Sequence, residues 1–176
     1  LFSTSPPMTR RQSILFSPVV VIGVGHVTAR AGGEVLGASV WIPLSVVFWV
    51  VVDRFTRLAP PHRRREWMQP AYGAWGWRVL ALSMAAIVLP LFLSQWRLVV
   101  PPSSFVPWLL FGLVNPWFEE RYWRGALLDA TAPWSAWIRV TYTATVFAAS
   151  HPLIFGVNSI GVRAPAVLVS TFVMGV

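Results

Sequence analysis

Uncharged apolar runs of membrane-spanning length constrain the fold of this chain more than any other feature. Residues 35–52 and 79–96, for example, contain no ionisable side chain. A transmembrane helix needs about 20 predominantly apolar residues, and only helices or closed barrels satisfy every backbone polar group within lipid. The runs lack the alternation with period two that is typical of barrel strands. The sequence therefore predicts an all-α, polytopic transmembrane helix bundle.

The composition agrees with a single membrane domain over residues 1–176. Hydrophobic residues make up 56% of the chain and charged residues 11%, whereas soluble domains carry roughly 25% charged residues. The chain contains no cysteine. Disulfide bonds, thiolate metal sites and thiol nucleophiles are therefore excluded.

About six hydrophobic segments can be distinguished along the chain, separated by turn-forming residues. Their approximate ranges are 14–29, 35–52, 79–96, 105–129, 138–157 and from 164 onward. A turn at Gly32-Gly33 is expected between the first two segments, and Pro101-Pro102 and Pro133 are expected in later loops. The chain begins without methionine and stops at Val176 inside an apolar run that is too short to span. We therefore expect it to be truncated at both ends.

The net charge of +8 indicates membrane orientation. Arg10 and Arg11 precede the first apolar run, and five further arginines follow the second run, namely Arg54, Arg57, Arg63, Arg64 and Arg65. Arginines beside short loops mark the cytoplasmic side of a membrane, so the N-terminus and the loop 53–78 are predicted to be cytoplasmic. We expect an integral protein of the bacterial inner membrane, in contact with lipid. Nucleic acid is not an expected partner, because these arginines lack interleaved aromatic platforms.

Two adjacent carboxylates, Glu119 and Glu120, lie within the fourth apolar segment. Ionisable groups at bilayer depth are costly unless they are partnered, and they are often functional. Residues four apart share a helix face, so Glu120 can pair with Arg124, while Glu119 points about 100° away. Glu119 is then the free carboxylate and the candidate general base. The alternative is a cluster of snorkelling charges at the cytoplasmic end of the helix.

The fifth segment carries Phe147 and His151, which are also four apart. A histidine in an apolar helix is either a hydrogen-bonded packing residue or a functional group. At the helical rise, Glu119 lies about 15 Å from Asp129, and His151 lies about 18 Å from Arg139. If Asp129 and Arg139 mark the cytoplasmic boundary, the carboxylate and the imidazole lie at similar depth on neighbouring helices.

These residues carry a family resemblance. Residues 119–124 form an EExxxR motif and residues 147–151 form an FxxxH motif, both within apolar segments. As a pair they resemble the CPBP family of intramembrane proteases (CAAX protease and bacteriocin-processing, or Abi) over about residues 98–176. The run Phe172-Val173-Met174-Gly175 resembles the start of the third motif of the family. The fourth motif, a histidine with Asn or Asp four residues later, is missing from the chain.

The resemblance implies an intramembrane endopeptidase that hydrolyses peptide bonds of a membrane-associated protein or peptide. Glu119, Glu120 and His151 would be catalytic, with a water that is activated by Glu119 and held jointly with His151. Arg124 and Phe147 would give electrostatic and structural support. Without the fourth motif, the 176-residue chain alone is expected to be inactive.

The same resemblance leaves a zinc metalloprotease open as an alternative. Glu119 and His151 would then be metal ligands. Adjacent positions such as Glu119 and Glu120, however, diverge by about 100° on a helix and are poor joint ligands. We therefore favour a glutamic endopeptidase without a cofactor.

A non-catalytic membrane protein is the competing class, either a scaffold or an immunity or transport-type protein that retains the fold. A transporter should show repeated halves with broken helices in corresponding places, and the sequence shows none. A scaffold could keep the EExxxR residues for packing alone. The sequence does not decide between this class and the protease.

Overall fold

The computed structural model describes residues 9–67, 105–158, 163 and 165–175, together with Trp75 and Val79. They fall into two compact units, one formed by residues 1–67 and 115–176 and the other by residues 68–114. The expected loop at Pro101-Pro102 and, apart from Val79, the expected third segment 79–96 lie outside the described residues. The rest of the description concerns the first unit.

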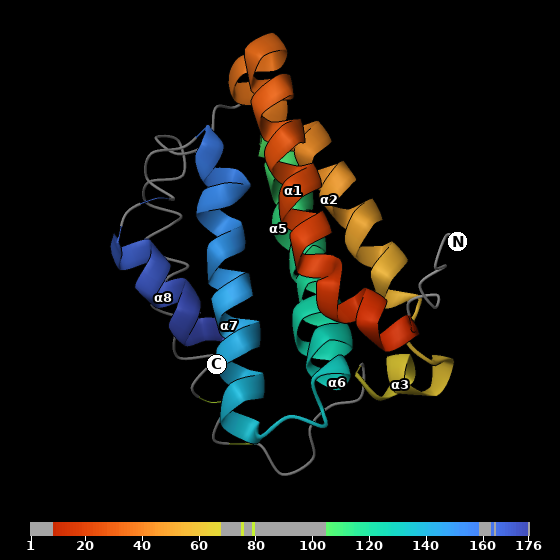
Figure 1. The fold of residues 1–176 in the computed structure, drawn as a ribbon. Helices are drawn as coiled ribbons and strands as arrows, with labels where there is room; N and C mark the ends of the chain where they lie inside the picture. Colours follow the sequence, from red (N-terminus) through yellow and green to blue (C-terminus); the bar gives the residue numbers. More distant parts are fainter. Residues whose placement is uncertain are drawn as a thin grey trace, which may run out of the picture. The chain divides into compact units, whose positions relative to one another are not determined.

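The described residues form helices and no β-strand, which confirms the predicted all-α class. The elements are α1 (Arg10–Leu36), the 3-10 turn η1 (Gly37–Val40), α2 (Trp41–Thr56), α3 (Pro61–Glu66), α5 (Phe105–Glu119), the π-helix η3 (Glu120–Leu127), α6 (Leu128–Ala130), α7 (Ala136–Leu153), the 3-10 turn η4 (Phe155–Val157) and α8 (Pro165–Gly175) (Figure 1). The expected turn at Pro133 is confirmed, because residues 131–134 form a turn between α6 and α7.

Two stretches of the described chain, α1 and residues 136–157, are long and apolar enough to cross a membrane. Helix α1 also carries an exposed apolar stripe, with 61% of Phe16, 73% of Val19 and 65% of Val27 accessible. Soluble monomers rarely expose contiguous apolar surface of this kind, whereas a helix that faces lipid requires it. The chain is therefore an α-helical membrane protein.

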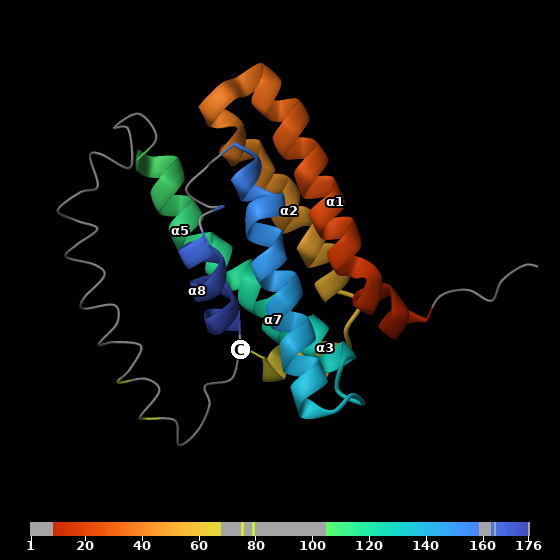
Figure 2. The ribbon, with the colours of Figure 1, turned by 60° about the vertical axis from the view of Figure 1, so that its left-hand side comes forward.

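Helices α1 and α7 run side by side in the same direction (Figure 2). The Tyr142 hydroxyl donates to the Leu15 carbonyl at 2.8 Å, and His26 Nδ1 lies 2.7 Å from the Leu153 carbonyl. Because a carbonyl oxygen can only accept, His26 carries its proton on Nδ1. Both pairs are separated by 127 positions in the sequence. The two helices therefore keep one register between these contacts, and α7 brings its FxxxH residues to the side of α1.

The expected turn at Gly32-Gly33 is wrong, because α1 continues through both glycines to Leu36. The chain turns at Gly37, whose φ of 55° is a conformation that glycine adopts without strain. The two earlier glycines allow close packing: a Cβ on Gly32 would lie 2.6 Å from Val40 Cγ2, and a Cβ on Gly33 would lie 2.6 Å from the Asn158 side-chain oxygen. The sequence pattern alone does not distinguish a turn glycine from a packing glycine.

The buried core lies between α1, α2, η3 and the end of α7. Its largest members are fully enclosed side chains from each of these elements, namely Val21, Phe48, Tyr122, Leu127 and Ile154. Near the start of α1, Arg11 links this helix to α6, because its Nε donates a hydrogen bond to the Ala130 carbonyl at 2.8 Å. The EExxxR segment is therefore held between the first two helices and α7.

Replacing Gly32 by alanine should destabilise the protein, because the new methyl group would overlap the buried Val40 side chain. Overpacking of this kind costs about 1–3 kcal/mol. Gly23→Ala is the matched control, since no atom lies within 4 Å of a Cβ at that position of the same helix. Thermal unfolding in detergent should show a lower midpoint for Gly32→Ala and an unchanged or higher one for Gly23→Ala. Equal midpoints would contradict the packing role of Gly32.

Candidate active site

The EExxxR motif begins where the helix changes its geometry. The α-helical hydrogen bonding of α5 ends at Glu119, and residues 120–127 form the π-helix η3. Short π-helical insertions are rare and occur frequently at functional sites. The sequence analysis treated this segment as a regular helix and missed the change. The signal in the sequence is Pro116, which lies inside α5 and has no amide hydrogen for the helical ladder.

The inward face of η3 is anchored by Tyr122, which is fully buried. Its hydroxyl lies 2.6 Å from Ser17 Oγ on α1. Ser17 Oγ in turn donates to the Ile14 carbonyl at 2.6 Å, so the Tyr122 hydroxyl is the donor in the shared hydrogen bond. This chain of hydrogen bonds fixes the rotation of η3 about its axis relative to α1.

Trp67 supports η3 from the basic loop. A Cβ on Gly125 would lie 2.7 Å from the Trp67 ring, so the indole ring packs directly on the backbone of the motif helix. The indole nitrogen donates to Asp129 Oδ2 at 3.1 Å. The loop that the sequence marks as cytoplasmic therefore contacts the end of the motif helix near Asp129, which the sequence analysis took as a boundary residue.

Residues of both motifs line one small cavity of about 30 Å³ between η3 and α7. The lining residues are Glu119, Glu120, Trp123, Arg124, Thr143 and Phe147. A cavity needs only about 10–15 Å³ of space of this kind to hold a water molecule. The cavity is therefore large enough for a bound water and lies directly against the glutamate pair.

The two glutamates have different surroundings, as their spacing predicts. Arg124 forms an ion pair with Glu120 one turn earlier, and both side chains are about half exposed. Glu119 is more enclosed, and the Asn115 amide is a hydrogen-bonding partner of its carboxylate. The expected pairing of Glu120 with Arg124 is therefore present, and Glu119 is left without a formal counter-ion pair among the described residues.

Asn115 is a residue of the site that the sequence analysis missed. It is only 7% exposed, and its side-chain oxygen accepts a hydrogen bond from Trp49 Nε1 at 3.0 Å. Trp49 also stacks on Phe118, with ring centroids 5.6 Å apart and planes 11° apart. An amide oxygen held in this way leaves the NH₂ group of Asn115 to face Glu119. The only sequence signal is that a polar residue stands one turn before the carboxylate in an apolar helix.

Trp123 adds an indole N–H group to the cavity wall. The side chain is 3% exposed, and its Nε1 has no hydrogen-bond partner within the described part of the chain. A buried donor of this kind usually bonds to an ordered water. Its position beside a water-sized cavity makes the Trp123 N–H a candidate donor to that water.

His151 lies one turn beyond the cavity and is not among the residues that line it. Its ring packs edge-on against Phe147, with centroids 4.9 Å apart, and Phe147 packs in the same manner against Trp123 at 5.9 Å. His151 Nδ1 lies 3.0 Å from the Phe147 carbonyl and must therefore carry the proton, which leaves Nε2 as an acceptor. The structure places Glu119, Glu120, Arg124 and Phe147 together and His151 one aromatic ring away. The catalytic roles of these residues stay predictions.

The zinc alternative lacks a complete ligand set within residues 9–67, 105–158, 163 and 165–175. No three His, Asp or Glu side chains in these ranges lie close enough together to hold a metal ion. Glu119 and His151 alone supply two of the three protein ligands that a catalytic zinc needs. These residues do not fit a zinc site, so we derive no step through a metal.

Comparison with known proteins identifies the family of the motif region. Residues 101–176 match the family model described as Type II CAAX prenyl endopeptidase Rce1-like. The matched segment is therefore similar to the Rce1-like family, and it covers 76 of the 176 residues of the chain. The match confirms the resemblance predicted from the two motifs, and the Rce1-like segment contains all five residues predicted for the site. No curated protein and no solved structure matches the chain.

Removing the Ser17 hydroxyl should destabilise the protein through Tyr122. Ser17→Ala leaves the buried tyrosine hydroxyl without its acceptor, which costs about 1–3 kcal/mol. Adding Tyr122→Phe removes the stranded hydroxyl, so the double variant should lose less stability than the two single losses combined. Unfolding in detergent measures the four species of this double-mutant cycle. Strictly additive losses would show that the hydrogen bond does not hold η3 to α1.

Proposed function

We propose that this protein is an intramembrane endopeptidase of the CAAX type, which hydrolyses peptide bonds of a membrane-associated protein or peptide. The observation that carries the proposal is the water-sized cavity that the EExxxR and FxxxH residues share. Similarity of residues 101–176 to the Rce1-like family supports a protease. Two described stretches that are able to cross a membrane support its action within the bilayer.

In the proposed reaction, Glu119 is the general base. Its carboxylate accepts a proton from the water in the cavity, and the water oxygen attacks the carbonyl carbon of the scissile peptide bond. Glu119 then gives the proton to the nitrogen of the leaving amine as the carbon–nitrogen bond breaks. Asn115 keeps the carboxylate oriented from one side, and Trp123 Nε1 is available to hold the water from another.

The proposal also assigns roles to Glu120 and His151. Glu120 forms an ion pair with Arg124, so the proposal assigns it no proton transfer and leaves that role to Glu119. His151 Nε2 is the acceptor that the proposal assigns to the water on the α7 side. Phe147 separates His151 from the cavity, so the Phe147 side chain has to move when substrate binds.

The small volume of the cavity limits how a peptide substrate can reach Glu119. About 30 Å³ admits a water molecule but no peptide segment. A peptide must therefore displace side chains of the η3–α7 wall to reach Glu119. Glu120 and Arg124 form the exposed part of this wall, and a substrate held in the membrane would meet them first. We propose a mechanism without a cofactor, because the adjacent glutamates diverge on the helix.

Glu119→Gln in the full-length protein should abolish most of the proteolysis, because the amide has nearly the same shape but cannot accept the proton. Loss of a general base typically costs about 10²–10⁴-fold in rate. Cleavage of a membrane-anchored peptide reporter measures the effect. Glu66→Gln is the matched control, because Glu66 is an exposed surface glutamate that forms an ion pair with Arg63 outside the cavity. Normal cleavage by Glu119→Gln would rule out Glu119 as the general base, whereas absence of cleavage by the unsubstituted protein would favour the non-catalytic scaffold.

The proposed orientation places the N-terminus and the basic loop in the cytoplasm. Because the chain contains no cysteine, single cysteines can be placed at exposed positions in either end region. His62→Cys in α3 should react with a membrane-impermeant maleimide only after the inner membrane is opened. Ser39→Cys in η1, at the far end of α1 and α2, should react in intact spheroplasts. The reverse pattern of labelling would refute the orientation.

A further inference from the structure

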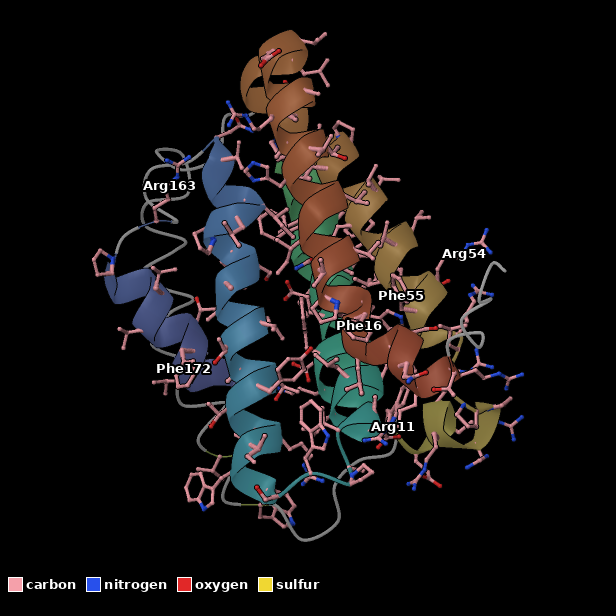
Figure 3. All side chains as sticks on the ribbon, viewed as in Figure 1. Arg11, Phe16, Arg54, Phe55, Arg163 and Phe172 are labelled. Carbon is pink, nitrogen blue, oxygen red and sulfur yellow. The ribbon has the colours of Figure 1, made fainter. Side chains whose placement is uncertain are left out.

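A second cavity, of about 290 Å³, lies where α1 begins, between the α2–α3 loop and α6. Its polar lining consists of Arg10, Arg11, Arg63 and Asp129, and the rest of the lining is apolar. Figure 3 shows Arg11 beside α3 and the end of the motif helix. The cavity shares no lining residue with the cavity at Glu119, and the proposed peptide hydrolysis does not use it.

The mouth of this cavity carries an excess of positive charge. Asp129 is the one carboxylate among its described lining residues, and it already accepts a hydrogen bond from Trp67 Nε1 and lies 3.9 Å from Arg63 Nε. Arg11 uses Nε to bind the Ala130 carbonyl, so its two terminal nitrogens stay available as donors. Arg10 is exposed at the start of α1. Guanidinium groups arranged in this way suit an anion with several oxygens, above all a phosphate.

The floor of the cavity is apolar, in contrast to its positively charged mouth. Ile14 and Ala126 are buried members of the core that line it. The cavity lies at the start of α1, which is long and apolar enough to cross a membrane. Its apolar floor is therefore next to the end of a membrane-spanning helix. A soluble phosphate would gain nothing from this floor, whereas the glycerol and acyl groups of a lipid would bury apolar surface there.

We propose that this cavity binds an anionic phospholipid of the cytoplasmic leaflet. Its phosphate lies between Arg10, Arg11 and Arg63, and its glycerol and first acyl carbons contact the floor at Ile14. Basic pockets beside transmembrane helices on the cytoplasmic side are suited to such headgroups. The bound lipid would join the start of α1 to α3 and α6, the elements that support the end of the EExxxR helix.

The test is lipid-dependent thermal stability of the full chain, purified in a neutral detergent. Dioleoyl phosphatidylglycerol should raise the unfolding midpoint, because a ligand that binds only the folded state stabilises it. Dioleoyl phosphatidylcholine and soluble glycerol 3-phosphate should leave the midpoint unchanged. An equal rise with phosphatidylcholine would overturn the requirement for an anion, and an equal rise with glycerol 3-phosphate would overturn the lipid as occupant.

Three variants locate the effect. Arg10→Gln with Arg63→Gln should lose the rise caused by phosphatidylglycerol, measured against the same variant without lipid. Arg54→Gln with Arg65→Gln removes equal charge from exposed positions outside the cavity and should keep the rise. Ala132→Leu keeps every arginine and fills the cavity from an exposed lining position, so it should lose the rise.

Each opposite result refutes the proposal. An unchanged rise in the Arg10 and Arg63 variant would show that these arginines do not bind the lipid. A loss in the Arg54 and Arg65 variant would show diffuse attraction to the whole basic face. A rise that persists in Ala132→Leu would place the lipid outside the cavity, and this variant also decides the question if the double arginine variant fails to fold.

Discussion

The hydrogen bond between Ser17 and Tyr122 is enclosed on all sides by the core, and it links the first helix of the chain to the motif helix 105 residues later. A buried hydroxyl without a partner is costly, so the π-helix must keep Tyr122 toward α1. Once that rotation is set, Trp123 and both glutamates line the small cavity beside α7. The geometry of the candidate site therefore depends on a contact between Ser17 and Tyr122, neither of which lines the cavity.

The charges near the site are distributed in a way that suits an apolar medium. Glu120 has Arg124 as a partner on its own helix, so this pair needs no other element to hold it. Glu119 is instead held by a neutral group, Asn115, which Trp49 and Phe118 keep in place. A neutral partner orients a carboxylate without cancelling its charge. The pair of glutamates thus divides into one group with a charged partner on its own helix and one group with a neutral partner, and the proposed hydrolysis uses the second as its base.

Much of the fold follows from local patterns. Apolar runs identify α1, α2, α7 and α8 to within several residues, because lipid requires helices there whatever their neighbours are. The expected turn at Gly32-Gly33 is wrong because a glycine permits both a turn and a close helix contact, and only the position of Val40 shows which one occurs. The π-helix was missed for a related reason. It places Tyr122 and Gly125 in contact with residues that are distant in the sequence, and local spacing does not reveal those contacts.

The sequence by itself determined the helical membrane class, the two motifs, their resemblance to a known family and the ion pair between Glu120 and Arg124, because each depends on composition or on spacing within one helix. Only the tertiary structure decided which side chains share a cavity. It brought Phe147 and Thr143 of α7 to the glutamates and left His151 one aromatic ring away. It also added Asn115 and the Trp123 N–H, which has no hydrogen-bond partner among the described residues. These placements depend on the rotation of one helix against another, which is set by contacts between residues far apart in the chain.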